Sequence, residues 1–216
     1  MMKPEATENE KLLPAHSVAE RQFYIMVLQC AECAGGGFDR VGEEESEDGK
    51  ADIWHVRCRT CGSGRQLLFD RSALLIQEGE NLPVVAPVGT RSELLDVGQW
   101  LALFYTVLGA ASETSDKKES RRLGYEATLC LEEALKFYPP DSELPREDAF
   151  FANASKERFH EHAEQFTRDR LYRMRERLPS LRVMRASIDE HSREETARRG
   201  RSTLRQRFGS LFGRRT

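Results

Sequence analysis

Two short motifs decide the fold of this chain: Cys30-Ala31-Glu32-Cys33 and Cys58-Arg59-Thr60-Cys61. One tetrahedral metal ion takes four soft ligands, and two C-x-x-C pairs joined by a hairpin bring four thiolates together at a suitable separation. Four thiolates complete the tetrahedron and leave no position for water, which is typical of a structural rather than a catalytic metal. The sequence therefore predicts one structural zinc ion held by Cys30, Cys33, Cys58 and Cys61.

Two other uses of these cysteines compete with zinc. A single iron ion of the rubredoxin type takes the same ligands, but its knuckles resemble C-x-x-C-G, and here Gly62 follows only the second motif while Ala34 follows the first. Two local redox disulfides would suit a pair that opens a helix after a strand, as in thioredoxin-like proteins. Residues 1–20 are polar and acidic rather than leader-like, so we expect a reducing cytoplasmic setting, which favours metal over disulfides.

The segments around the cysteines predict a small antiparallel β-structure. Gln22–Gln29 is apolar and rich in β-branched and aromatic residues, and it predicts a strand that leads into Cys30. Asp48-Gly49, in the acidic stretch 43–50, marks a hairpin turn. Three further strands are expected at Phe38–Val41, Asp52–Arg57 and Gln66–Phe69.

With these flanking strands and the four cysteines, residues 22–70 resemble the zinc-ribbon group. The resemblance covers about 50 of the 216 residues and does not extend to a family for the whole chain. Zinc ribbons often serve transcription, translation or protein assembly, so the resemblance implies a module that binds nucleic acid or protein.

Helical periodicity begins after residue 71. Two prolines, Pro83 and Pro87, indicate an extended linker, and residues 72–77 suggest a short helix before it. Three long helices are expected at about 92–111, 119–138 and 155–178, the first capped by Thr90 or Ser92.

The second of these helices is similar to the second helix of a tetratricopeptide repeat. Ala127, Ala134 and Pro139 fall at matching offsets. Two features depart from the repeat, namely the longer loop 112–118 and the lack of a second copy about 34 residues away. The resemblance implies only a helix pair of similar packing, a kind of structure that usually binds proteins.

The expected class is α+β: a small antiparallel zinc ribbon, then an α-helical domain and a basic C-terminal arm. The expected organisation is a disordered acidic N-terminus (1–20), the ribbon (21–71), a linker (72–91), a helical domain (92–190) and the arm (191–216). The net charge of −3 hides an asymmetry, because eight arginines and two glutamates give residues 193–216 a charge of +6 and leave −9 for the rest. No run of about 18 apolar residues is present, so no membrane-spanning helix is expected.

The arm predicts a short basic amphipathic helix, with apolar residues at i, i+4, i+7 and i+8 and arginines around them. It resembles C-terminal membrane-targeting helices of bacterial peripheral proteins, which implies docking to an anionic membrane surface. Nucleic-acid phosphates, a protein groove or no partner at all remain alternatives. The contact residues would be Leu204, Arg205, Arg207, Phe208, Leu211, Phe212, Arg214 and Arg215.

The remaining motifs favour binding over catalysis. The chain has no G-x-S-x-G, P-loop or H-E-x-x-H motif, and we infer no small-molecule substrate. His160-Glu161-His162 fits a charged helix face better than a metal site, and Cys130 fits a core position. We therefore expect a non-enzymatic, cytoplasmic zinc-binding adaptor for an unidentified protein, attached to a membrane surface by the arm. The alternative is a nucleic-acid-associated regulator that uses the arm and ribbon residues Arg57, Arg59, Arg65 and Arg71, with Trp54 and Phe69 for stacking.

Overall fold

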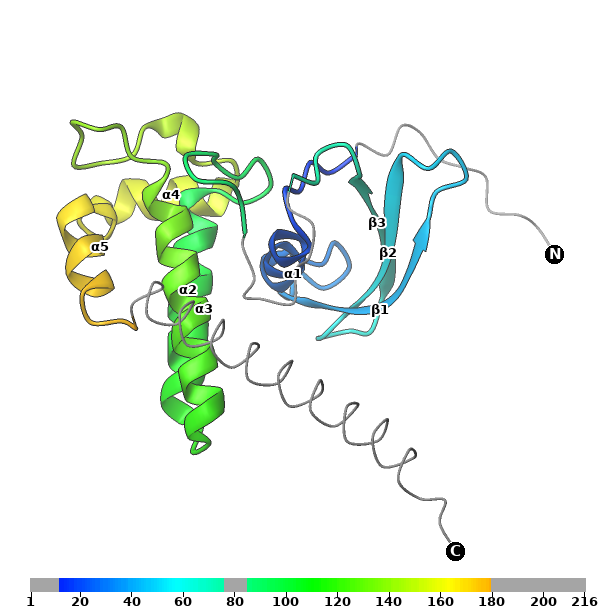
Figure 1. Ribbon diagram of the computed structural model, residues 1–216, viewed down its shortest axis with the longest axis horizontal. Coiled ribbons are helices and arrows are strands. Elements are labelled where there is room, and N and C mark those ends of the chain that lie inside the picture. The colour runs from blue at the N-terminus through cyan, green and yellow to red at the C-terminus, as the bar shows by residue number, and fades with distance from the viewer. Residues whose placement is uncertain (1–11, 76–84, 180–216) are drawn as a thin grey trace, which may run out of the picture.

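A computed structural model describes residues 12–75 and 85–179, and Figure 1 shows a sheet with one helix beside it, followed by a group of helices. The α+β class is confirmed: a three-stranded antiparallel sheet in the order β1-β2-β3 precedes the helical part. The predicted arm (191–216), the first eleven residues and linker residues 76–84 lie outside the described residues. None of the described helices is both long and apolar enough to cross a membrane.

The predicted strand at Gln22–Gln29 is wrong, because this segment belongs to helix α1, Val18–Val27. The side chain of Ser17 accepts a hydrogen bond from the backbone N–H of Glu20, which caps the first turn. A short apolar run does not by itself distinguish a helix from a buried strand. The spacing Ser17-x-x-Glu20 before an apolar run is a helix-start signal, and this signal was present in the sequence although the prediction did not use it.

The expectation of disorder over residues 1–20 is also wrong for the part that the structure describes. The Leu13 N–H donates to the Leu68 carbonyl at 2.8 Å, and the Asp70 N–H donates to the Leu13 carbonyl at 2.9 Å. Leu13 thus forms a parallel bridge beside Phe69, and Ala15 behind it is fully buried. The residues before α1 therefore extend the edge of the sheet.

The sheet consists of β1 (Phe38–Glu45), β2 (Ala51–Cys58) and β3 (Gly64–Asp70). The predicted turn joins β1 and β2, where the Gly49 N–H donates to the Ser46 carbonyl at 2.9 Å. Phe38 pairs with Cys58, so the register places the start of β1 beside the second cysteine motif. A bulge between Arg40 and Gly42 interrupts β1. The expected strands at residues 38–41, 52–57 and 66–69 therefore form, each somewhat longer than predicted.

Helix α1 packs on one face of this sheet and brings a buried charge with it. Arg21 is 1% exposed, and its guanidinium donates to the Asp52 carboxylate on β2 at 2.6 Å. The same guanidinium lies 4.9 Å from the ring centroid of Phe69 and 5.9 Å from that of Trp54. An ion pair and two cation–π contacts thus compensate part of the cost of burying this arginine, whose Nε and Nη2 atoms have no hydrogen-bond partner among the described residues.

The helical part is built on an antiparallel pair, α2 (Val97–Glu113) and α3 (Lys117–Leu135). Helix α2 begins later than Thr90 or Ser92 would place it, because Asp96 and Gln99 form a capping box. Ser92 still accepts hydrogen bonds from the N–H groups of Leu94 and Leu95, which orders the turn before the helix.

The predicted helix at 155–178 is interrupted. Its residues form α4 (Asn153–Glu161), the 3-10 turn η2 (Ala163–Phe166) and α5 (Arg168–Arg175), after a first 3-10 turn, η1 (Glu147–Ala149). Phe166 is buried against the rings of Phe150 and Phe159, and Tyr138 donates its hydroxyl to the Phe166 carbonyl at 2.6 Å. Tertiary packing around Phe166 thus outweighs the helical periodicity. The short helix expected at 72–77 is likewise absent from its described residues, 72–75, which form a turn.

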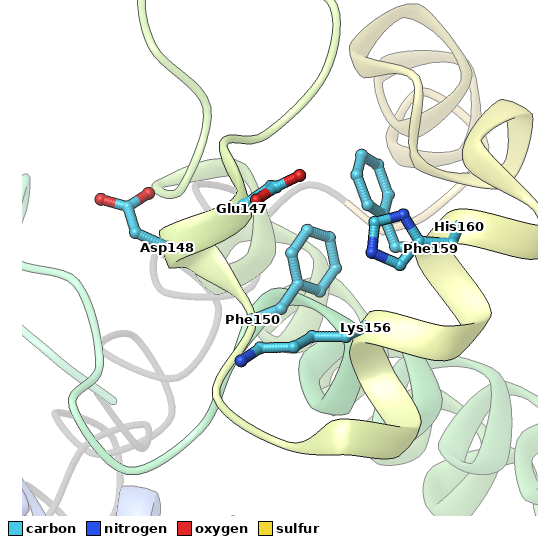
Figure 2. A pocket seen from close by; sticks show the side chains of 6 residues that line it. All are labelled: Glu147, Asp148, Phe150, Lys156, Phe159 and His160. Carbon is cyan, nitrogen blue, oxygen red and sulfur yellow. The ribbon is translucent and has the colours of Figure 1, made fainter.

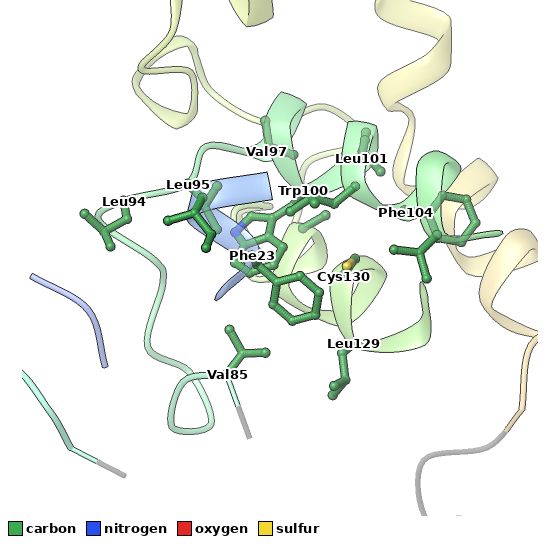
Figure 3. Packing of buried hydrophobic residues seen from close by; sticks show 14 of the residues in the cluster. Phe23, Val85, Leu94, Leu95, Val97, Trp100, Leu101, Phe104, Leu129 and Cys130 are labelled. Carbon is green, nitrogen blue, oxygen red and sulfur yellow. The ribbon is translucent and has the colours of Figure 1, made fainter. Parts of the chain in front are cut away.

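One hydrophobic core joins the two parts (Figure 3). Phe23 of α1 contacts Trp100 of α2 edge to face, with ring centroids 5.5 Å apart. The linker is fixed from both sides: the Ser17 hydroxyl donates to the Val85 carbonyl at 2.6 Å, and Lys136 donates to the carbonyls of residues 86 and 87 at 3.3 Å. The sheet part and the helical part therefore pack as one body.

Candidate metal centre

The first cysteine motif lies in a loop between α1 and β1, and backbone hydrogen bonds hold it. The Cys30 N–H donates to the Gly35 carbonyl at 2.8 Å, and the Ala34 N–H donates to the Cys30 carbonyl at 2.9 Å. The Gly35 N–H points at the Cys33 sulfur, 3.4 Å away. A turn of this kind directs backbone N–H groups towards sulfur, where they stabilise thiolate charge.

The second motif closes the turn between β2 and β3 in the same way. The Cys58 N–H donates to the Ser63 carbonyl at 2.8 Å, and the Gly62 N–H donates to the Cys58 carbonyl at 3.0 Å. The Thr60 N–H donates to the Cys58 sulfur at 3.4 Å. The two turns are therefore near copies of each other, one on each side of the sulfur cluster.

The four predicted ligands meet: the sulfurs of Cys30, Cys33, Cys58 and Cys61 all lie within 4.8 Å of one another. Two of the separations between the motifs are 3.7 Å, from the Cys30 sulfur to the Cys61 sulfur, and 3.8 Å, from the Cys33 sulfur to the Cys58 sulfur. A tetrahedron with metal–sulfur bonds of about 2.3 Å has sulfur–sulfur edges of about 3.8 Å. These distances fit one metal ion at the centre, and all four cysteines are free thiols rather than disulfides.

The ionisation of the sulfurs also fits a cation. A hydrogen bond from the Ser63 hydroxyl is the main reason that the pKa of Cys30 falls to about 6, and it lowers the pKa of Cys61 as well. For Cys33, the Gly35 N–H lowers the pKa, but Cys61, burial and the other thiols together raise it to about 12. Negative charges this close repel each other, and a divalent cation would stabilise thiolate at every position.

Burial divides the four ligands into two classes. Cys30 and Cys58, the first cysteine of each motif, are buried, whereas Cys33 and Cys61 are exposed. Each turn thus anchors one sulfur in the core and presents the other near solvent. A metal held between them has no free position, since all four tetrahedral ligands come from the chain.

Most other predicted site residues lie elsewhere or outside the described residues. The eight arm residues from Leu204 to Arg215 belong to the second group. Trp54 and Phe69 are fully buried and are not available to stack on a nucleic-acid base. Arg59 is paired with Asp39 at 2.8 Å, while Arg57 is exposed. The expected stacking surface on the ribbon is therefore wrong.

The helical part contributes no second metal cluster among the described residues, where the four cysteines form the one group with metal-ligand spacing. His162 instead lies 3.6 Å from the carboxylate of Glu164, and His160 borders a pocket of about 280 Å³ between η1 and α4. Figure 2 shows the Phe150 and Phe159 rings among the side chains that line this pocket. Its volume lies below the usual range for ligand pockets, roughly 300–1,000 Å³.

Cys130 occupies the predicted core position, fully buried on α3. Burial raises the pKa of this thiol, so it stays protonated and unreactive. The residue that sequence reasoning missed is Ser63, whose hydroxyl lies 3.3 Å from two of the sulfurs. Its position two residues after Cys61 was the available signal, but only the folded turn shows that it also reaches Cys30.

No protein-family profile, curated protein or solved structure matches this chain. The interpretation of the cysteine cluster therefore rests on its geometry and chemistry.

Proposed function

We propose that this protein is a non-enzymatic adaptor whose cysteine cluster holds one structural zinc ion. The observation that carries the proposal is the closed donor set, four sulfurs from two matching turns within 4.8 Å of one another. Zinc accepts four thiolates in a tetrahedron and has no redox chemistry that would require an open position. A metal of this kind supplies folding free energy rather than chemistry.

Iron is the main competitor for the same site. The argument against iron from Ala34 loses force, because Ala34 takes a left-handed backbone conformation, with φ +55°, as Gly62 does with φ +76°. Metal analysis of the purified full-length protein separates the two ions. One zinc per chain supports the proposal, whereas a coloured protein with one iron and an absorption spectrum of ferric thiolate would contradict it.

Substitution of an exposed ligand tests the site itself. We expect Cys33→Ser to lower the zinc content or to weaken zinc binding by orders of magnitude, since serine is a poor ligand for zinc. Cys130→Ser is the matched control, because Cys130 is buried on α3 and is not part of the cluster. Equal zinc affinity in Cys33→Ser and in the wild-type protein would contradict a four-thiolate site.

The adaptor role is supported by the way in which the metal site is attached to the rest of the chain. The cysteine turns belong to a sheet whose helix, α1, shares a core with the α2–α3 pair through Phe23 and Trp100. A structural metal in this position would keep the helical surface in a fixed relation to the ribbon. We propose that an unidentified protein binds this body and that the basic arm provides a second contact, with an anionic membrane surface.

Vesicle flotation of the zinc-loaded full-length protein tests the arm. We expect flotation with anionic vesicles at physiological salt and its loss in the double variant Phe208→Ala/Phe212→Ala, because the two rings would be the buried anchors. A phosphate-binding arm would keep its affinity in that variant, since its arginines are unchanged. Absence of flotation in the wild-type protein would remove the membrane contact and favour nucleic acid or a protein groove.

A further inference from the structure

The two cysteine turns share one backbone pattern but differ at a single informative position. In each turn the first cysteine N–H donates to the carbonyl five residues later, at 2.8 Å in both cases. These carbonyls belong to Gly35 in the first turn and to Ser63 in the second. Gly35 and Ser63 therefore occupy equivalent places around the sulfur cluster.

At Gly35 a side chain would clash with its neighbours, whereas at Ser63 the side chain contacts the sulfur cluster. At Gly35, a Cβ atom would lie 2.5 Å from the Thr60 hydroxyl oxygen and 3.1 Å from the Cys33 sulfur. Ser63, in contrast, carries a half-buried side chain whose hydroxyl lies 3.3 Å from the sulfur of Cys61 and 3.3 Å from that of Cys30. The hydroxyl therefore bridges one ligand from each motif.

Backbone N–H groups act on all four sulfurs, and two of the sulfurs also lie beside the Ser63 hydroxyl. Cys33 and Cys58 accept N–H groups from the backbone, which no side-chain substitution removes. Cys30 and Cys61, 3.7 Å apart, share the Ser63 hydroxyl. Among the described residues, Ser63 is the one non-cysteine residue whose side chain is hydrogen-bonded to these sulfurs.

We propose that Ser63 is a positioning residue of the metal centre: its hydroxyl tethers Cys30 to Cys61 across the two motifs and so sets the affinity for the metal. The inference rests on the proposed zinc site. When both sulfurs are thiolates, the hydroxyl donates its single proton to one of them and withdraws part of its charge. Before the metal binds, the Cys61 thiol donates to the Ser63 oxygen while the Ser63 hydroxyl donates to the Cys30 sulfur, and this chain of two hydrogen bonds fixes the separation of the two ligands. Loss of a partner of this kind commonly costs roughly 10- to 100-fold in metal affinity.

The test measures zinc affinity of full-length variants by competition with a chromophoric chelator near pH 7. We expect Ser63→Ala to raise the dissociation constant roughly 10- to 100-fold and Ser63→Thr, which keeps the hydroxyl, to restore most of the affinity. Ser72→Ala is the matched control, because the Ser72 hydroxyl bonds to Asp70 rather than to a sulfur. The control should bind zinc like the wild-type protein.

Cobalt substitution adds a readout that a merely structural role would not change. The intensity of the thiolate-to-cobalt absorption reports the number of sulfur ligands, and its energy reports their charge. We expect Ser63→Ala to keep the intensity and to shift the band. Circular dichroism of the zinc-saturated variants checks that they share the wild-type fold.

The outcomes separate this inference from the proposed function. A wild-type protein that binds no metal would overturn both. Tight wild-type binding that Ser63→Ala matches within twofold would overturn only the role of Ser63. If Ser63→Thr lost as much zinc affinity as Ser63→Ala, the effect would come from packing at this position rather than from the hydroxyl. That result would also overturn the proposal.

Discussion

At the residue scale, the residue after each C-x-x-C motif must adopt a backbone conformation that favours glycine. The backbone there is left-handed, with φ +55° at Ala34 and +76° at Gly62. Such a conformation costs a residue with a side chain about 1–2 kcal/mol, whereas glycine takes it freely. The two turns are matched in their backbone-to-backbone hydrogen bonds, so Ala34 is the one strained member of the pair.

Ala34→Gly should therefore stabilise the zinc-loaded protein slightly. The relief of strain outweighs the added entropy of glycine in the unfolded chain, and we expect a gain of up to about 1 kcal/mol. Ala34→Val should destabilise it, since a β-branched residue fits this conformation worst. Chemical denaturation of the zinc-saturated variants measures both, with Gly62→Ala as the destabilising counterpart in the second turn. A loss of stability in Ala34→Gly would contradict the argument.

The cysteine residues themselves could be assigned from sequence, but Ser63 could not. Two C-x-x-C pairs are local patterns whose chemistry needs little more than spacing, and the four sulfurs do meet. The contact of Ser63 with Cys30 joins residues 33 positions apart and depends on the register of two strands. Trp54 and Phe69 illustrate the same limit, because sequence alone did not tell which face of the sheet helix α1 covers.

At the element scale, two helices begin with an aspartate in different surroundings. Asp96 is fully buried before α2 and accepts hydrogen bonds from three backbone N–H groups, those of Gln99, Phe151 and Ala152, and from the Ser155 hydroxyl. It therefore ties α4 to α2. Asp116 before α3 is exposed and caps only its own helix through the Lys118 N–H.

Asp96→Ala and Asp116→Ala form a matched pair that differs in burial. We expect Asp116→Ala to cost about 0.5–2 kcal/mol of unfolding free energy, as for an ordinary cap. Asp96→Ala should cost more, about 3–5 kcal/mol, because several buried donors lose their acceptor. Denaturant unfolding gives both values. Equal costs would mean that the contacts of Asp96 with α4 contribute nothing.

Helix α3 carries an acid whose burial opposes its ionisation. Burial raises the pKa of Glu133 to about 7, more than Lys136 lowers it, and Glu20 and Glu132 add to the rise. Lys136 lies 2.6 Å from the Glu133 carboxylate and also holds the linker carbonyls of Ala86 and Pro87. Within this cluster, Glu20 is bonded in turn to His16.

Glu133 should make stability fall as pH rises. Its folded pKa lies above the usual value of about 4.5, so the folded state holds the proton more tightly between pH 4.5 and 7. The contribution is full below pH 4.5 and is lost as pH rises through 7, of the order of 3 kcal/mol. Glu133→Gln cannot titrate, so its unfolding free energy relative to the wild type should increase across this range. A constant difference would contradict the assignment, and the pH dependence of metal binding cancels in the comparison.

The bounds of a helix or strand could be predicted from the sequence where a local signal sets them. They could not be predicted where contacts with distant residues set them. The turn at residues 48 and 49 and the α2–α3 pair follow from local patterns. Helix α1 was not predicted, because its apolar run suggested a strand although Ser17 carries a local cap signal. The break between α4 and α5 depends on the rings that bury Phe166, and no local pattern marks it.

At the scale of the whole molecule, the metal centre and the helical part are linked through one core. The free energy of binding of structural zinc, about 10–16 kcal/mol, is comparable to the total stability of a typical domain, about 5–15 kcal/mol. If the cysteine cluster holds zinc as proposed, the sheet part should therefore unfold without metal. Because Phe23 of α1 packs on Trp100 of α2, the loss should extend beyond the cysteine turns to the helices.

Tryptophan fluorescence can follow both parts, since Trp54 lies in the sheet and Trp100 in α2, and both are fully buried. Trp100→Phe reports the sheet alone, and Trp54→Phe reports the helical part alone. On removal of zinc by a chelator, we expect a red shift of the Trp54 emission as the ribbon unfolds, and a smaller red shift of Trp100 as Phe23 leaves its ring. Cys130→Ser, which leaves the cluster intact, should respond like the wild type. If Trp54 shifted while Trp100 kept its emission, the helical part would fold independently, and the shared core would not transmit the loss of metal.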